Sequence, residues 1–126
     1  MVVVCRGGDC GNRSKHPGFD HAAQLAAVRE GVQGSATVAV SKCLDACDMS
    51  NVVVVVPGQV QRDAGMTPVW LGNVLTPDAT DDVVGWIVAG GPAAEPPSLV
   101  QIVTFTPTRL SRRELDEPGT LSGPQH

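Results

Sequence analysis

Apolar and β-branched residues gather in short runs that are separated by glycine, proline and polar residues. The first run leads directly into a glycine-rich segment that begins at Arg6. Because valine favours extended backbone and glycine and proline interrupt it, each run predicts a strand. The predicted strands are Val2–Cys5, Thr37–Val40, Asn51–Val56 and Val69–Leu75. The third lacks polar alternation, so we expect it to be central in the sheet or partly buried by a second subunit.

Two other segments repeat their apolar residues at helical spacing. The first is Phe19–Val32, and its expected inward face consists of Ala22, Leu25, Ala26, Val28 and Val32. In the second, Thr76 stands as an N-cap before Pro77 at the first helical position. Its apolar face consists of Val83, Trp86 and Ile87. The order β-α-β-β-β-α predicts an α/β protein with a four-stranded sheet that ends near Gly91.

The composition changes after Gly91. Residues 92–126 contain six of the ten prolines, so we expect a domain over residues 1–91 and a Pro-rich extension over residues 92–126. The strand propensity of Leu99–Phe105 predicts that residues 98–106 add an edge strand or contact a partner. The remainder of the extension, in particular Ser111–His126, is expected to be flexible.

Length and charge exclude several classes of protein. A chain of 126 residues with 42% hydrophobic residues suits one small domain. The formal net charge of −4 offers no broad basic field, so we do not expect nucleic-acid binding. The longest apolar run, Val52–Val56, is far too short for a membrane helix. The N-terminal segment has no basic start and no cleavage site, which predicts a cytoplasmic protein without membrane attachment.

Four cysteines form two closely spaced pairs. Four residues separate Cys5 from Cys10, three separate Cys43 from Cys47, and 32 residues lie between the pairs. Each pair follows a predicted strand, so the sheet can bring the two loops together. Four thiolates that converge from two loops are the ligand set of an iron–sulfur cluster. The glycines of the first loop would let backbone N–H groups approach the sulfurs.

Three other uses of these cysteines compete with the cluster. Two disulfides would suit a secreted protein, but no export signal is visible. A structural zinc ion takes the same four thiolates, although its ligands more often have C-x2-C spacing. A thiol–disulfide enzyme would need a C-x-x-C pair at a helix start, and neither pair has that spacing. The cluster is therefore the preferred interpretation and zinc its main alternative.

Several segments together resemble a known family. They are Val3–Cys5 with Cys10, Lys42–Cys47, Asn51–Val55 and Trp70–Val74. Over about residues 2–91 they resemble the thioredoxin-like [2Fe-2S] ferredoxins, especially the standalone ferredoxin-domain proteins of actinobacteria. The cysteine pairs are also similar to those of the peripheral iron–sulfur subunit of respiratory NADH dehydrogenases. The resemblance implies a thioredoxin-like fold with a mixed sheet, a [2Fe-2S] cluster near one end of the sheet, and often a homodimer.

The expected function is one-electron transfer between a reductase and an acceptor, which would be the redox partner proteins. No serine-histidine-acid set, phosphate-binding glycine loop or carboxylate pair stands out, so we do not expect an enzyme. The alternative is a non-enzymatic interaction module or sensor in which a four-cysteine zinc or iron–sulfur site is structural.

Basic residues and histidines also lie close to the cysteines in sequence. The basic residues are Arg6, Arg13, Lys15 and Lys42. They could form a docking rim for a redox partner, or they could be ordinary solvated surface charges. His16 and His21 flank the first loop, and we expect them at the surface because four cysteines already satisfy a cluster.

Overall fold

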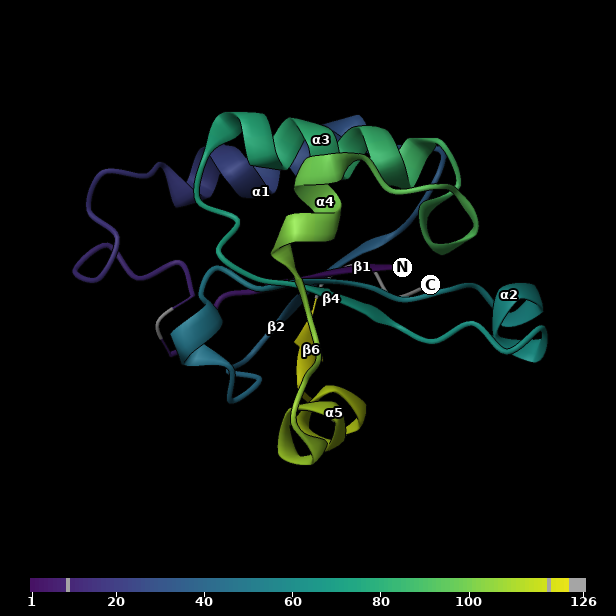
Figure 1. Ribbon diagram of the computed structural model, residues 1–126. Coiled ribbons are helices and arrows are strands. Elements are labelled where there is room, and N and C mark those ends of the chain that lie inside the picture. The colour runs from purple at the N-terminus through teal and green to yellow at the C-terminus, as the bar shows by residue number, and fades with distance from the viewer. Residues whose placement is uncertain (9, 118, 123–126) are drawn as a thin grey trace.

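A mixed sheet forms the centre of the computed structural model, which describes residues 1–8, 10–117 and 119–122 (Figure 1). In these residues the sheet has six strands in the order β5-β4-β3-β1-β2-β6. They are β1 (Val2–Cys5), β2 (Val38–Ser41), β3 (Val53–Val55), β4 (Val69–Leu71), β5 (Thr104–Phe105) and β6 (Leu121–Ser122). Only β1 and β2 run parallel. The α/β class is confirmed, whereas the expected number of four strands is wrong because the extension adds β5 and β6 at the edges.

Helices cover the two faces unequally. They are α1 (His21–Gly31), α2 (Gln59–Asp63), α3 (Pro77–Val88), α4 (Ser98–Val103) and α5 (Arg109–Asp116), with short 3-10 turns η1 (Cys47–Met49) and η2 (Gly91–Ala93). Helices α1, α3 and α4 lie over one face, and α5 lies on the opposite side (Figure 1). The side chain of Thr76 accepts a hydrogen bond from Ala79 N–H at 3.0 Å, which confirms the predicted N-cap. No helix among the described residues is long and apolar enough to cross a membrane.

Apolar clusters lie on both sides of the sheet. Val2 and Val4 belong to the cluster beneath α1, α3 and α4, whereas Val3 and Cys5 belong to the cluster on the opposite face. This alternation is the two-residue period of a strand. Because both faces are covered, the whole valine run Val52–Val56 is buried. The prediction of a central strand is confirmed, since β3 lies between β4 and β1.

The inward face of α1 differs from the predicted face. His21 and Gln24 are buried, whereas Ala22 and Ala26 are exposed. The polar side chains are accommodated because they have partners inside the protein. Gln24 Nε2, for example, donates a hydrogen bond to the carbonyl oxygen of Val74 at 2.8 Å. The prediction that His21 lies at the surface is therefore wrong.

The extension is more ordered than its composition predicts. Instead of a strand over residues 98–106, the structure has helix α4 over Ser98–Val103, and only Thr104–Phe105 is extended. Val100 of α4 is fully buried in the core, so packing overrides local strand propensity. Helix α5 and strand β6 likewise replace the expected flexible tail, while residues 118 and 123–126 lie outside the described residues.

Candidate metal centre

The parallel pair β1 and β2 brings the two cysteine loops together. Cys5, the last residue of β1, is in register with Ser41, the last residue of β2. The carboxyl ends of parallel strands meet at the same edge, so the loops that carry Cys10 and Cys43 start side by side. Figure 1 shows both loops at the same end of the sheet, on the left. The expected position of the site near one end of the sheet agrees with this arrangement.

All four cysteines are free thiols, and they gather as two pairs. The Sγ atoms of Cys43 and Cys47 lie 3.5 Å apart. The side chain of Cys10 lies close enough to that of Cys5 to change its pKa. Among the described residues, no three side chains of His, Cys, Asp or Glu converge tightly enough to hold one metal ion. The arrangement is therefore pairwise.

Glycines let the first loop pack directly against the second pair of sulfurs. A Cβ atom on Gly8 would lie 2.6 Å from Cys47 Sγ and 3.0 Å from Cys43 Sγ. A Cβ atom on Gly7 would overlap the backbone nitrogen of Cys43. Gly8 also has a φ angle of 59°, in the left-handed region that glycine adopts without penalty. Only glycine fits both positions, and the reason is this close packing.

Backbone N–H groups point at two of the sulfurs. Val52 N–H donates to Cys10 Sγ at 3.3 Å, and Asp45 N–H donates to Cys43 Sγ at 3.4 Å. Such bonds stabilise the negative charge of a thiolate and tune the potential of a bound cluster. Each cysteine pair therefore has one member that a backbone donor positions.

The two pairs differ in burial and in acidity. Cys5 and Cys10 are 2% and 4% exposed, whereas Cys43 and Cys47 are half-buried. Interaction with the side chain of Cys10 lowers the pKa of Cys5 from 9.0 to about 6, although burial opposes this change. The same interaction, together with burial, raises the pKa of Cys10. Burial also raises the pKa of Cys43. The opposite pKa shifts make Cys5 the more acidic thiol of the first pair, and a bound metal would displace the protons of its ligands.

Arg6 lies inside the site. Its guanidinium donates to the carbonyl oxygens of Cys5 at 2.8 Å and His21 at 3.0 Å, and to Gln24 Oε1 at 2.8 Å. Its positive charge interacts favourably with Cys5 and Cys10, while burial lowers the pKa of Arg6. A positive charge in this position favours thiolates and their metal complexes.

The other basic residues do not form a common rim with Arg6. Lys15 Nζ donates to the carbonyl oxygen of Cys47 at 3.3 Å, which places it beside the second loop. Arg13 and Lys42 are exposed. Arg6 is thus part of the interior of the site, and a docking rim could include only the other three residues.

A buried polar network behind the first loop was missed by the sequence analysis. Asn51 is fully buried, and its Oδ1 accepts from Gly11 N–H at 2.8 Å. Its Nδ2 donates to His21 Nδ1 at 2.9 Å and lies 3.3 Å from Gln24 Oε1. Because His21 Nδ1 accepts, the Nε2–H of the neutral ring donates to the carbonyl oxygen of His16 at 3.2 Å. The signal in the sequence was a single asparagine directly before the valine run.

The extension holds the second cysteine loop in place. Ser111 of α5 is buried, and its hydroxyl donates to the carbonyl oxygen of Asp45 at 3.1 Å. On the other side of the loop, Lys42 N–H donates to the carbonyl oxygen of Thr120 at 2.9 Å, next to the pairing of β6 with β2. The loop between Cys43 and Cys47 is therefore bracketed by residues that follow the predicted domain boundary at Gly91.

Comparison of the chain with protein-family models, with curated proteins and with solved structures gives no match. The resemblance to ferredoxins therefore depends on the segments of this chain alone. The function must be argued from the geometry of the four cysteines.

Proposed function

We propose that the protein is a one-electron carrier that holds one [2Fe-2S] cluster on Cys5, Cys10, Cys43 and Cys47. The observation that supports it is the pairwise gathering of four free thiols, with 3.5 Å between the sulfurs of the second pair. A [2Fe-2S] cluster takes four cysteines, two on each iron, so each pair of this chain would serve one iron. A structural zinc ion would instead draw all four sulfurs around a single centre.

The surroundings of the pairs suit a redox group. When bound, the cluster takes up and returns one electron, and its negative charge increases on reduction. The positive charge of Arg6 and the N–H donors of Val52 and Asp45 offset that charge. The half-buried pair Cys43 and Cys47 is nearer to solvent than the first pair. Electrons would therefore enter and leave through the second loop, where a reductase or an acceptor would dock.

Apart from the turn η1 and the five-residue helix α2 between β3 and β4, the elements follow the order β1-α1-β2-β3-β4-α3, which supports the thioredoxin-like arrangement that the resemblance implies. We therefore propose this fold for the part of the chain before Gly91. A homodimer, redox partner proteins and a cytoplasmic location belong to the same proposal, and the chain is not expected to be an enzyme by itself.

Spectroscopy of anaerobically purified protein tests the proposal. Visible absorption and EPR spectra are recorded before and after reduction with dithionite, and iron, sulfide and zinc are assayed on the same sample. Two irons and two sulfides per chain, with an EPR signal that appears on reduction, are expected for a [2Fe-2S] protein. Circular dichroism in both states checks that reduction leaves the fold intact. A colourless, zinc-loaded protein would overturn the proposal in favour of a structural module.

A further inference from the structure

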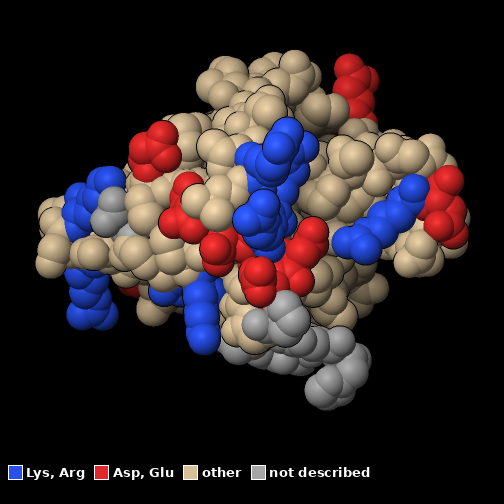
Figure 2. Space-filling view, turned by 90° about the horizontal axis from the view of Figure 1, so that it is seen from below, with Lys and Arg blue, Asp and Glu red and all other residues tan. Residues whose placement is uncertain are grey.

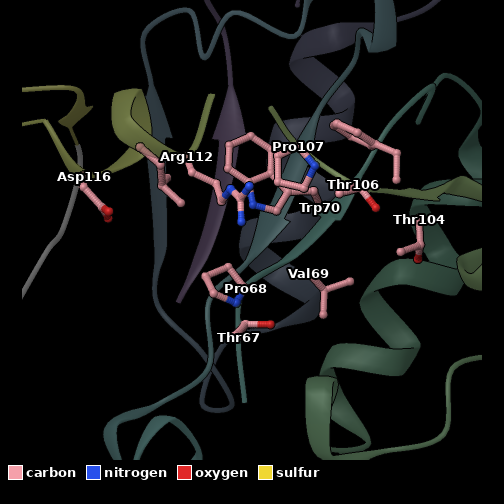
Figure 3. A pocket seen from close by; sticks show the side chains of 11 residues that line it. Thr67, Pro68, Val69, Trp70, Thr104, Thr106, Pro107, Arg112 and Asp116 are labelled. Atoms are coloured by element: carbon pink, nitrogen blue, oxygen red, sulfur yellow. The ribbon is translucent and has the colours of Figure 1, made fainter. Parts of the chain in front are cut away.

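A pocket of about 430 Å³ lies on the face of the sheet opposite α1 and α3 (Figure 3). Strands β4 and β5 form one wall, and α5 forms the other. The volume lies within the range of small-ligand sites, about 300–1,000 Å³. Neither the cluster proposal nor the four cysteines account for this pocket.

Flat apolar side chains line most of the pocket. Trp70 and Phe105 meet edge to face, with ring centroids 6.1 Å apart, and Pro68 and Pro107 also line the wall. Trp70 is only 2% exposed, so the surrounding core holds its ring in a fixed position. Fixed aromatic rings and proline rings favour a ligand that is itself flat and apolar, such as an aromatic ring.

Two residues of opposite charge belong to the α5 wall, with Arg112 in the middle of the pocket and Asp116 at its edge (Figure 3). Arg112 and Asp116 both line the pocket and lie four residues apart on the helix, which places them on the same side. Within the described part of the chain, neither side chain has an ion pair or a hydrogen bond. Figure 2 shows charges of both signs side by side on the face seen from below, where α5 lies. Figure 3 shows the side chain of Arg112 extending into the middle of the pocket view.

We propose that this pocket binds a free aromatic α-amino acid in its zwitterionic form. The aromatic ring would lie against Phe105, Pro68 and Pro107, the carboxylate on Arg112 and the ammonium group on Asp116. An α-amino acid carries its two charges on neighbouring groups, so adjacent side chains of opposite charge on one helix can pair with both. A purely anionic ligand would face the carboxylate of Asp116. A residue within a peptide chain carries neither charge and would leave both side chains unpaired.

Calorimetric titration of the full chain with three matched compounds tests the proposal. L-Phenylalanine has both charges, 3-phenylpropanoate lacks the ammonium group, and 2-phenylethylamine lacks the carboxylate. We expect phenylalanine to bind most tightly, with each missing charge weakening binding by up to about fivefold, as for solvent-accessible ion pairs. No binding of phenylalanine, or equal binding of all three compounds, would overturn the proposal.

Variants locate the binding on the pocket. The affinity of Arg112→Gln for phenylalanine should fall to the affinity of the unchanged chain for 2-phenylethylamine, which lacks the carboxylate. The affinity of Asp116→Asn for phenylalanine should fall to the affinity of the unchanged chain for 3-phenylpropanoate, which lacks the ammonium group. Arg113→Gln is the matched control, because Arg113 lies on the same helix and is exposed but does not line the pocket. Thr106→Trp should fill the pocket and abolish binding while the circular dichroism spectrum stays unchanged. Equal losses in the Arg112 and Arg113 variants would refute the assignment, whatever the outcome for the cluster.

Discussion

Replacing Gly8 with alanine would force the two cysteine loops apart. In Gly8→Ala the added methyl group would stand 2.6 Å from Cys47 Sγ and 3.0 Å from Cys43 Sγ. Ordinary van der Waals contact begins at 3.4 Å, so the shorter contact must lengthen by about 0.8 Å. A metal site accepts departures of only about 0.2 Å from its ligand distances. If the four cysteines hold the proposed cluster, we therefore expect the variant to contain much less iron than the unchanged protein.

The same substitution lowers the free energy of unfolding through two separate effects. A side chain at the left-handed φ angle of 59° costs about 1–2 kcal/mol. Crowding the sulfurs adds the cost of overpacking, about 1–3 kcal/mol. The total expected loss is about 2–5 kcal/mol.

Gly34→Ala is a matched control for the backbone effect. Gly34 has a φ angle of 85°, and no atom lies within 4 Å of the methyl group that alanine would add. The free energy of unfolding of this variant should fall by only about 1–2 kcal/mol, and its iron content should equal that of the unchanged protein. Urea denaturation followed by circular dichroism measures the first quantity, and an iron assay with the visible spectrum measures the second. If the two variants lost equal stability and both retained iron, the close packing of Gly8 against the sulfurs would be refuted.

Three further substitutions test the surroundings of the cysteines. Arg6→Gln should lower the midpoint potential in an EPR-monitored redox titration, because it removes a positive charge that offsets the added electron; an unchanged potential would contradict this role. Asn51→Ala leaves buried partners of the network unpaired, so the free energy of unfolding measured by urea denaturation should fall by about 1–3 kcal/mol. An unchanged urea midpoint would contradict the role of the network. Ser111→Ala should lower the free energy of unfolding by about 1 kcal/mol and speed amide hydrogen exchange around Asp45. Unaltered exchange would show that α5 does not hold the loop.

Local signals were sufficient for the first strand and for the helix that follows Thr76. The strand Val2–Cys5 was predicted with its observed bounds, and the helix that begins at Pro77 was predicted from its N-cap and proline. Both depend on the preferences of a few consecutive residues, which act in the same way in any fold. The structure pairs β1 and β2 in parallel, and this pairing places the two loops that follow them at one edge of the sheet.

Packing decided the part of the chain after Gly91. The residues around Val100 favour a strand locally, but they form α4 because this helix buries Val100 against the core. Proline content likewise predicted a flexible tail, whereas α5 and β6 attach to the second cysteine loop and to β2. The composition of a segment indicates how much apolar surface the segment can bury by itself. It does not indicate how much the segment can bury against the rest of the protein.

The sequence alone determined the first four strands, the two cysteine loops and the glycine-rich character of the first loop. Only the tertiary structure decided that the thiols gather as two pairs, that Arg6 and His21 turn inward, and that the extension brackets the site. The deciding contacts join distant residues, as in the bond from Ser111 to Asp45 across 66 positions. Such a bond forms because folding buries Ser111 beside the carbonyl oxygen of Asp45 and the buried hydroxyl then needs a partner, a requirement that leaves no local pattern in the sequence.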